Sequence, residues 1–573
     1  MASIKGITPV LDNTALIMRL RSIVGDHFVL TGPERTRRFR TGIRFGSGPA
    51  MAVVQPAGLL DQWRVLAACV AADKIVIMQA ANTGLTGGST PDGEDYDREI
   101  VIISTLRMSS VYPIHEGRQV ICLPGATLFQ LETVLRPFGR TPHSVIGSSC
   151  IGASVLGGIC NSSGGSLLQR GPAYTQMALF ATIDETGAIH LVNHLGLNLG
   201  PDPETVLDRL DRRAFDESDI DYNTGRSGSD GDYFEHVRDV DAATPARFNA
   251  DPRRLFEASG SAGKIVIFAV RLDTFEQDED TSVFYVGSGD TSELELIRRH
   301  ILTAFKSLPI AGEYIHRNAF DLAEKYGKDM FIAIQHFGTA RLPTLFAIKA
   351  RLDAWSSRWK ILPRDLSDRL MQAVGRLFPA HLPKRMKEFR DRFEHHLLLR
   401  MSGPGIGEAR AYLNSMFPSF HGAFFECTAE EGDKAFLHRF VVAGAAIRYR
   451  AIHRDLVEDI VSLDIALRRN DRDWFERLPS DVQAPIIHSI YYGHFFCHVF
   501  HQDYIVAKGH DTMALEHKMW DLLNARGAEY PAEHNVGHLY HAKPSLTSHY
   551  RALDPCNIFN PGIGQTSKLR RWE

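Results

Sequence analysis

The sequence predicts a two-lobed α+β protein, and three observations predict it. A strand–helix–strand pattern over residues 52–78 runs directly into a glycine-rich loop at residues 79–91. A second glycine-dense stretch, residues 145–165, lies in the same half of the chain. From about residue 271 onward, strands alternate with amphipathic helices, which indicates a second α+β domain. With 573 residues the chain is long enough to bury several cores.

The elements of the first half follow from apolar spacing and from chain-breaking residues. Residues 14–40 read as a helix followed by a basic stretch, and the extended piece 52–54 stops before Pro56. Residues 59–72 place apolar side chains at helical spacing, and residues 75–78 read as a buried strand. Residues 202–241 are rich in Asp and Glu, which predicts a solvated insertion, and residues 264–270 read as the closing strand.

Composition and charge exclude several classes of protein. The chain has 64 Lys and Arg against 68 Asp and Glu, a net charge of -4, and 44% hydrophobic residues, which is typical of a globular protein and predicts no nucleic-acid partner. Seven widely spaced cysteines without a Cys-x-x-Cys pair predict buried thiols in a reducing compartment. We find no secretion signal in the first residues and no apolar run near the ~20 residues that span a bilayer, so the default expectation is cytoplasmic.

One segment departs from this balance of charge. Between Arg341 and Arg400 there are fourteen Lys or Arg against six Asp or Glu, interleaved with Trp355, Trp359, Leu362, Leu377, Phe378 and Phe389. Basic residues that alternate with Trp, Leu and Phe are typical of a segment that binds anionic lipid headgroups and inserts apolar side chains. A basic helical face packed on the protein, or a nucleic-acid patch, would have the same composition.

The 79–91 loop follows a strand and offers small residues whose backbone amides can surround an anion. Because it lacks the Lys-Ser/Thr ending of a triphosphate-binding loop, a dinucleotide pyrophosphate is the better ligand. Either glycine-rich loop alone would be weak evidence, since such turns often serve only to reverse the chain. Their occurrence together strengthens the prediction.

Both loops carry a family resemblance. The stretch 80–89 resembles the pyrophosphate loop of vanillyl-alcohol oxidase type flavoproteins, and residues 143–154 and 157–165 resemble their second FAD-contacting segment. Over nearly its whole length, including residues 326–329, 435–440 and 531–538, the chain is similar to the bacterial quinone-dependent D-lactate dehydrogenases, which are peripheral membrane flavoenzymes. The 554–555 and 560–564 stretches resemble the C-terminal signature of the superfamily, which fixes the tail near the flavin.

The resemblance implies a domain plan and a set of FAD contacts. It implies an FAD-binding domain at 1–270 with the acidic insertion 202–241, a cap domain at 271–340 and 396–510 interrupted by a basic membrane-binding segment at 341–395, and a C-terminal segment, 511–573, that returns to the flavin. The residues implied in FAD binding are Ala80, Ala81, Asn82, Thr83, Gly84, Gly88, Ser89, Gly147, Ser154, Gly164 and Ile267.

A histidine-rich pattern near the C-terminus suggests a metal or a catalytic base. His494 and His501 lie seven residues apart, and Glu533-His534 follows. Two imidazoles and a carboxylate form a common divalent-metal set, and related 2-hydroxyacid dehydrogenases hold a metal with a similar pattern. Seven residues is an unusual spacing within one strand, so a bend between the two histidines is expected. Asn535 and the Phe495-Phe496-Cys497 turn depart from those relatives, which leaves a structural pair of histidines as the alternative.

The chemistry of a 2-hydroxy acid assigns the remaining roles. A neutral histidine suits removal of the hydroxyl proton, and His534 is the first choice. A guanidinium matches the substrate carboxylate, with Arg317 and Arg439 as candidates. We therefore predict FAD-dependent oxidation of D-lactate to pyruvate, with transfer of electrons to quinone at the cytoplasmic face of the bacterial inner membrane. The alternatives are a flavin dehydrogenase for another D-2-hydroxy acid such as 2-hydroxyglutarate, and a metal-dependent hydrolase built on His494, His501 and Glu533.

Overall fold

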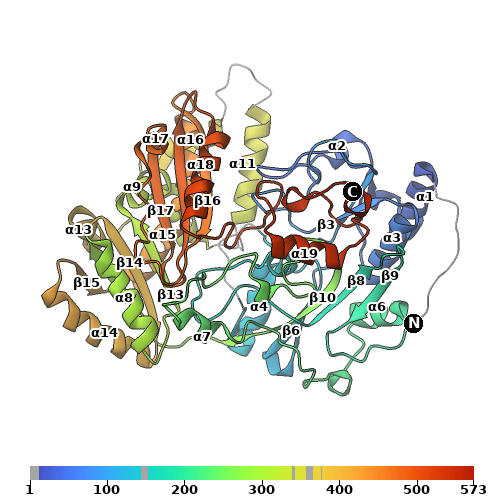
Figure 1. The fold of residues 1–573 in the computed structure, drawn as a ribbon, viewed down its shortest axis with the longest axis horizontal. Helices are drawn as coiled ribbons and strands as arrows, with labels where there is room; N and C mark the ends of the chain where they lie inside the picture. The colour runs from blue at the N-terminus through green and yellow to red at the C-terminus, as the bar shows by residue number, and fades with distance from the viewer. Residues whose placement is uncertain (1–11, 144–151, 339–341, 357–364, 376) are drawn as a thin grey trace.

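The structure is a computed structural model, and it describes residues 12–143, 152–338, 342–356, 365–375 and 377–573 of the chain. Two lobes lie side by side (Figure 1). The N-terminal lobe holds the residues up to β10 (Val266–Asp273) together with the C-terminal residues from α19 (Pro544–Leu553) onward, and the cap lobe is formed by the residues between them. Both lobes mix helices and strands, so the predicted two-lobed α+β class is confirmed.

The N-terminal lobe contains two main sheets within the described residues. In one, β2, β3 and β4 run parallel with β1 antiparallel at the edge, in the order β1-β2-β4-β3; the other is antiparallel, in the order β5-β6-β10-β8-β9. The strands are β1 (Val29–Leu30), β2 (Ala52–Val54), β3 (Ile75–Gln79), β4 (Ile100–Ser104), β5 (Val111–Ile114), β6 (Gln119–Cys122), β8 (Ala178–Ile183) and β9 (Ile189–Asn193). A short pair joins β7 (Arg140–Thr141) to β11 (Phe275–Glu276).

Helices cover these sheets, and the predicted strand–helix–strand unit is β2, α3 and β3. The helices are α1 (Asn13–Val24), α2 (Pro33–Thr36), α3 (Leu59–Ala71), α4 (Leu128–Leu135), α5 (Val155–Cys160) and α6 (Pro203–Asp211). The next helix, α7 (Tyr233–Arg238), packs instead against α8 (Thr291–Ala304) of the cap lobe. The acidic stretch 202–241 is less solvated than predicted. It forms α6 and α7, and Val206, Leu207 and Leu210 recur on one face of α6, which packs against α3.

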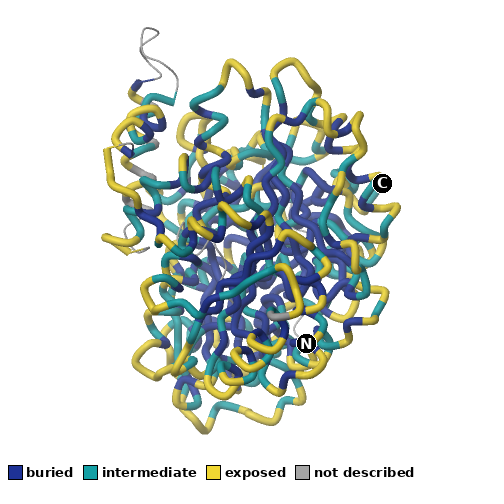
Figure 2. The backbone as a smooth tube through the Cα atoms, turned by 90° about the vertical axis from the view of Figure 1, so that its left-hand side faces the viewer, coloured by how far each residue is buried: buried dark blue, intermediate teal, exposed yellow. Residues whose placement is uncertain are grey.

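The cap lobe is built on an antiparallel sheet in the order β15-β12-β14-β13-β17-β18-β16. Its strands are β12 (Thr281–Ser288), β13 (Ala311–His316), β14 (His395–Ser402), β15 (Ala423–Glu426), β16 (Val457–Ala466), β17 (Ile486–His494) and β18 (Val499–Ala507). Since successive side chains of a strand point to opposite faces, the sheet buries residues on both sides. Figure 2 shows the resulting buried interior, with the exposed residues on the outside.

Two sets of helices cover the two faces of the cap sheet. We name the faces by one helix each: the α9 face carries α9 (Arg317–Tyr326), α13 (Lys384–Arg392), α15 (Ala429–Phe440) and α16 (Val442–Ile452), and the α8 face carries α8 (Thr291–Ala304), α14 (Pro404–Met416) and α18 (Thr512–Ala525). Tyr314 packs into the α8-face core and Ile315 into the α9-face core, as alternation requires. The short helix α17 (Ser480–Gln483) precedes β17.

The basic segment lies at the edge of the cap lobe. α10 (Lys328–Phe337), α11 (Leu342–Ser356) and α12 (Leu366–Gly375) precede α13, and α11 stands between the two lobes at the top of Figure 1. Arg448 of α16 forms ion pairs with Asp368 of α12, at 2.7 Å, and with Asp329 of α10, at 3.0 Å. Trp359 and Leu362 of the predicted membrane segment lie outside the described residues. Of the helices that are described, none is both long and apolar enough to cross a bilayer.

Large apolar side chains are exposed along this part of the chain. Together with the exposed Arg351, Arg369 and Lys384, these side chains form what we call the apolar–basic surface. Its apolar members are Phe337, Leu345, Ile348, Trp355, Leu370, Val374, Leu377 and Phe378. Leu377 is 85% exposed. By contrast, the last helix of the predicted segment, α13, buries Met386 and Phe389 in the core of the α9 face.

The chain ends on the N-terminal lobe. Beyond α18 it leaves the cap, crosses through residues 530–541 and reaches α19 beside the N-terminal lobe (Figure 1). Phe559 forms a parallel bridge with Val76 of β3, and the backbone of Asn560 bonds to Val76. The last stretch of the chain therefore pairs with β3, the strand that leads into the first glycine-rich loop.

Candidate active site

Two of the predicted residues, His494 and His501, lie side by side on the α9 face of the cap sheet. His494 ends β17, His501 is near the start of β18, and their ring centroids are 5.3 Å apart. The bend expected between them is a hairpin turn over Phe495–Cys497, closed by His498 in a left-handed conformation with φ of 54°. Because His501 pairs across the strands with Tyr492, two residues before His494, both imidazoles face the same side.

A buried carboxylate, Glu313, lies directly opposite His494 on the neighbouring strand β13. Glu313 Oε1 is 2.6 Å from His494 Nδ1, and Glu313 Oε2 is 2.9 Å from Nη2 of Arg439 on α15. The guanidinium of Arg439 lies over the ring of Tyr492, 4.5 Å from its centroid. Neither Glu313 oxygen is therefore left without a charged partner.

The loop that carries Glu533 and His534 reaches the same face from the C-terminal part of the chain. The backbone amides of Glu533 and His534 both donate to Asp464 Oδ2, at 2.7 Å each, and Asp464 Oδ1 is 3.4 Å from His501 Nδ1. Glu533 Oε2 is 3.3 Å from His494 Nε2, and the rings of His501 and His534 stack at 5.6 Å. We call this group the His494 cluster: Glu313, Asp464, His494, His501, Glu533 and His534.

Arg247 closes the cluster from the side of the N-terminal lobe. It is 2% exposed, forms an ion pair with Glu533 and donates from Nη2 to the carbonyl of Gly165 at 2.6 Å. Its Nε and Nη1 are buried and have no hydrogen-bond partner in the part of the chain that the structure describes. Arg247 thus offers the N–H groups of two guanidinium nitrogens to a ligand at the junction of the lobes.

The electrostatics of the cluster shift the pKa values of its two strand histidines in opposite directions. Burial by itself lowers the pKa of His494, but the carboxylates of Glu313 and Glu533 outweigh it and raise this pKa to about 9. Burial, together with the charges of His494 and His534, holds the pKa of His501 well below its ordinary value. Although burial opposes it, the charges of Arg247 and His494 also keep the pKa of Glu533 below its ordinary value. At neutral pH His494 is therefore charged and His501 neutral.

The two glycine-rich loops meet the cluster at glycines. A Cβ atom at Gly164 would collide with the carboxylate of Glu533, and one at Gly84 would collide with the side chain of Asn535. The hydroxyl of Thr86 donates to the carbonyl of Asn535 at 2.9 Å. The predicted catalytic loop and both predicted cofactor loops are therefore in direct contact, although they lie far apart in the sequence.

Comparison with known proteins identifies the family. A family model described as "D-lactate dehydrogenase, membrane binding" matches residues 283–572, and one described as "FAD binding domain" matches residues 50–192. Quinone-dependent D-lactate dehydrogenase of Escherichia coli (strain K12) is 58% identical, over 98% of each chain. The chain belongs to the quinone-dependent D-lactate dehydrogenase family. The Haemophilus influenzae and Corynebacterium glutamicum enzymes of this name are 57% and 47% identical, over 97% and 96% of this chain and 99% and 97% of their own.

Solved structures place the fold of this family member among the vanillyl-alcohol oxidase type flavoproteins, as predicted. p-Cresol methylhydroxylase superimposes with a TM-score of 0.58 at 11% identity over 98% of both chains. Alkyldihydroxyacetonephosphate synthase gives the same TM-score at 10% identity, over 98% of this chain and 87% of that one. At such low identity these structures support the architecture alone.

The N-terminal lobe of this D-lactate dehydrogenase family member fits a dinucleotide. Asn560 Nδ2 donates to the carbonyls of Gly88 and Ala262, at 2.9 and 2.8 Å, and so joins the first loop to residues 258–263. The hydroxyls of Ser162 and Ser261 and the Oδ1 atom of Asn560 are buried there without a partner among the described residues. Unpartnered polar atoms between glycine-rich loops suit a polar ligand that lies against the backbone. The predicted cofactor, FAD, is confirmed by the match to the FAD-binding family.

The residues predicted to hold FAD lie in the two glycine-rich loops, at the start of α5 and on β10. Asn82 donates to the carbonyl of Thr41 at 3.1 Å and accepts from Ser89 at 3.2 Å, and the Ser154 hydroxyl accepts from the amide of Gly157. Ile267 is buried on β10. Ala80, Ala81, Thr83, Gly84 and Gly88 are half-buried in the first loop, Gly164 faces Glu533, and Gly147 lies outside the described residues.

The two arginines predicted for the substrate carboxylate are in different places. Arg439 is at the cluster but is held by Glu313. Arg317, at the start of α9, donates to the Phe393 carbonyl at 3.1 Å and lies 3.6 Å from Glu394. Within the described residues no hydrogen bond or ion pair joins Arg317 to the His494 cluster.

The predicted metal ligands do converge. The ligand atoms of His494, His501 and Glu533 all lie within 4.8 Å of one another, and so do those of Asp464, His501 and His534. His501 belongs to both sets. Two imidazoles and one carboxylate are a suitable donor set for a divalent ion such as Zn²⁺.

Sequence reasoning missed Glu313, Asp464 and Arg247. Glu313 and Asp464 lie in ordinary strand sequences, and Arg247 lies in a loop without a motif. A charged residue inside an otherwise apolar strand was the available signal for the two acids, since buried carboxylates occur where they are paired.

Proposed function

We propose that this protein oxidises D-lactate to pyruvate with FAD and passes the electrons to a membrane quinone. The observation that carries the proposal is the His494 cluster, which meets the second glycine-rich loop where Gly164 touches Glu533. The cluster supplies acid–base groups beside a lobe of the FAD-binding family. The relatives at 47–58% identity are all named quinone-dependent D-lactate dehydrogenase. FAD bound in this lobe would supply the acceptor for the hydride that leaves the α-carbon of the substrate.

His534 is the proposed base for the substrate hydroxyl. Its amide is anchored on Asp464, and its carbonyl accepts from Asn249, so the backbone is held on both sides. The side chain remains 44% exposed, which leaves it open to substrate. An imidazole fixed in this way can accept the hydroxyl proton as hydride leaves the same carbon.

We propose Arg247 as the partner of the substrate carboxylate. Arg439 already holds Glu313 and Arg317 lies outside the cluster, whereas the Nε and Nη1 atoms of Arg247 are buried without an acceptor. The guanidinium can donate from these nitrogens to a carboxylate while Nη2 keeps Gly165 and Glu533, which a single ammonium group cannot do. Arg247→Lys should therefore raise the KM for D-lactate by roughly tenfold or more. An unchanged KM with the wild-type kcat would refute this assignment.

We also propose that His494, His501 and Glu533 hold a divalent metal. Their donor atoms face one another. His501 is neutral at physiological pH, as a ligand must be, whereas His494 would have to release its Nε2 proton when a cation binds. A cation at this place would polarise the substrate hydroxyl oxygen. Metal analysis of the purified holoenzyme after dialysis, with about one Zn²⁺ or Mn²⁺ per chain expected, tests the site.

The protein is a peripheral membrane protein, and its apolar–basic surface supports a finer proposal. This surface combines exposed Leu377 and Phe378 with the exposed cations Arg351, Arg369 and Lys384. Apolar side chains that insert and cations that meet phosphate headgroups are the two components of interfacial binding. We propose that it binds anionic lipid at the cytoplasmic face of the bacterial inner membrane.

Steady-state turnover with a short-chain ubiquinone analogue tests the function against its rivals. D-Lactate should give the highest kcat/KM in a panel that also contains L-lactate and D-2-hydroxyglutarate. A higher kcat/KM for 2-hydroxyglutarate would favour the other D-2-hydroxy acid reading. The metal-dependent hydrolase alternative is not supported, because the relatives are oxidoreductases by name and the N-terminal lobe matches an FAD-binding family.

A further inference from the structure

Glu313 occupies a position that fixes the ring of His494. The two residues are direct partners across the antiparallel strands β13 and β17, so their Cα atoms cannot move apart without breaking the sheet. Glu313 Oε1 accepts from His494 Nδ1 at 2.6 Å. The other ring nitrogen, Nε2, is then directed at Glu533 Oε2, 3.3 Å away.

Arg439 keeps this carboxylate charged inside the protein. Glu313 is 3% exposed, and an unpaired carboxylate at such a place would lose its charge or destabilise the fold. Nη2 of Arg439 meets Glu313 Oε2 at 2.9 Å, while the guanidinium packs over Tyr492 of β17. Arg439 is thus fixed by the same strand that carries His494, and Glu313 is held between the two.

We propose that Glu313, balanced by Arg439, is a positioning residue that holds His494 with Nε2 turned toward Glu533 and His501. The carboxylate accepts the hydrogen bond from Nδ1–H and so keeps the proton on Nδ1, which leaves Nε2 as the nitrogen that would face a bound cation and the substrate. Histidines that bind metals are commonly oriented by a carboxylate on their second nitrogen, and its loss costs about 10- to 100-fold in metal affinity or activity. The inference rests on the proposed function and assigns Arg439 a supporting role.

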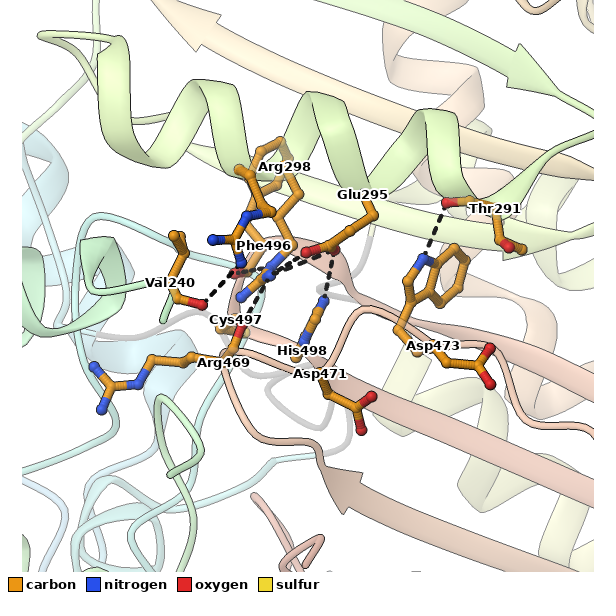
Figure 3. A network of polar contacts seen from close by, with 12 residues as sticks. Val240, Thr291, Glu295, Arg298, Arg469, Asp471, Asp473, Phe496, Cys497 and His498 are labelled. Atoms are coloured by element: carbon orange, nitrogen blue, oxygen red, sulfur yellow. Dashed lines mark hydrogen bonds and ion pairs between the residues drawn. The ribbon is translucent and has the colours of Figure 1, made fainter. Parts of the chain in front are cut away.

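The chain contains a matched network for a control. Glu295 of α8 bridges Arg298 Nη1 at 3.0 Å and His498 Nε2 at 3.3 Å, so it too is a buried carboxylate between an arginine and a histidine (Figure 3). This network lies on the α8 face, whereas the His494 cluster lies on the α9 face. Glu295→Gln therefore removes an equivalent charge without touching His494.

The experiment compares Glu313→Gln with Glu295→Gln in the holoenzyme. Anaerobic stopped-flow with D-lactate measures the limiting rate of flavin reduction and the apparent dissociation constant of D-lactate, and titration of metal-free holoenzyme with Mn²⁺ measures metal affinity. Glu313→Gln should lower the limiting rate and the Mn²⁺ affinity by about 10- to 100-fold while D-lactate affinity changes less than about threefold. Glu295→Gln should change each quantity by less than about threefold.

Two further variants keep the test decisive. Glu313→Asp retains the charge but shortens the side chain by one methylene, so it should fold and still be slow. In Glu313→Gln/Arg439→Gln both charges are absent, and the rate should also stay low. Recovery in the double variant would show that Glu313 serves only to neutralise Arg439, and would overturn the proposal.

Other outcomes separate this inference from the proposed function. A wild-type rate in Glu313→Gln, or an equal loss in Glu295→Gln, would overturn the role of Glu313 and leave the function intact. If D-lactate fails to reduce the wild-type flavin, the proposed function falls. The Mn²⁺ titration then decides on Glu313, because equal affinity in the wild type and both single variants contradicts its role.

Discussion

At the scale of single residues, positively and negatively charged side chains alternate along the candidate active site. Arg439 pairs with Glu313, Glu313 with His494, His494 with Glu533, and Glu533 with Arg247. With His494 protonated, Arg439, His494 and Arg247 face three buried carboxylates, since Asp464 also belongs to the cluster. The charges therefore balance, and a substrate carboxylate would be bound through the N–H groups of Arg247 that have no acceptor.

Replacing the proposed base should abolish substrate oxidation without loss of the cofactor. In His534→Ala no imidazole remains to accept the hydroxyl proton, and we expect D-lactate-dependent flavin reduction to slow by roughly 10²- to 10⁴-fold. FAD content, read from the ratio of visible to ultraviolet absorbance, should stay at the wild-type level. His541→Ala, an exposed histidine of the same C-terminal stretch, is the control and should reduce normally. Near-normal reduction in His534→Ala would remove His534 from this role.

A buried histidine outside the active site predicts the acid sensitivity of the cap. His438 of α15 is 1% exposed and packs against Phe320, and burial together with nearby His381 lowers its pKa to about 3. An unfolded chain takes up a proton on this histidine below pH about 6.5, whereas the folded chain does not until pH about 3. The contribution of neutral, buried His438 to the free energy of unfolding is therefore fully present above pH 6.5 and falls as the pH drops below that value.

The variant His438→Gln should make that fall shallower. Between pH 6.5 and 5 the wild type should lose up to about 2 kcal/mol more of its unfolding free energy than His438→Gln does. Denaturant unfolding of the cap followed by tryptophan fluorescence at several pH values measures the difference. His510→Gln, on the surface, serves as control. Identical pH slopes for wild type and His438→Gln would contradict the prediction.

The sequence predicts some site residues and not others for a physical reason. His494, His501, Glu533 and His534 stand out because a short stretch of chain concentrates donor groups. Glu313 comes from another strand, and its role depends on the register of β13 against β17, which no local pattern encodes. Local chemistry can thus be predicted from the sequence, but pairing between distant strands cannot.

At the scale of elements, the second glycine-rich loop and the Glu533 loop depend on each other. Gly164→Ala puts a Cβ atom against the Glu533 carboxylate, which must then move from His494 and Arg247. A displacement near 1 Å at a catalytic group costs about 100-fold in rate, so flavin reduction by D-lactate should fall on this scale. Gly289→Ala has open space around the new methyl group and should reduce normally. Wild-type rates in Gly164→Ala would show that the contact is not needed.

The apolar–basic surface predicts a measurable loss of membrane affinity on a single substitution. Leu377 is 85% exposed, and burying a leucine side chain contributes about 1.5–3 kcal/mol, so Leu377→Ser should weaken binding to anionic vesicles by roughly tenfold or more. Leu296→Ser on α8 is the matched control, since Leu296 is also exposed but lies away from this surface. Co-sedimentation with vesicles measures both. Equal binding of the Leu377 and Leu296 variants would contradict the proposed surface.

The basic segment shows where prediction from composition stops. The charge surplus marked residues 341–400 as one unit, but the structure divides them. α11 and α12 carry exposed apolar side chains, while Met386 and Phe389 of α13 are buried beneath β12. Composition averages over a window, whereas burial depends on which sheet face a helix meets. A deletion that tests membrane binding should therefore stop before Leu382, which is part of the cap core.

At the scale of the whole molecule, the proposed catalytic centre lies at the junction of the lobes. The N-terminal lobe contributes Gly164 and Arg247, the cap sheet contributes His494 and His501, and the crossing segment contributes Glu533. The two lobes could be predicted from the change in pattern near residue 271 and from the glycine-rich loops. Their contact could not, because it depends on side chains brought together by folding of the entire chain.

Electron flow from D-lactate through flavin to quinone is the central step of the proposed function, and one anaerobic experiment tests it most directly. The purified holoenzyme is mixed with D-lactate or L-lactate without oxygen, and its visible absorption is followed before and after a quinone analogue is added. We predict that D-lactate bleaches the flavin, that L-lactate does so far more slowly, and that quinone restores the oxidised spectrum. A protein without flavin absorption, or a flavin that D-lactate leaves oxidised, would contradict the account.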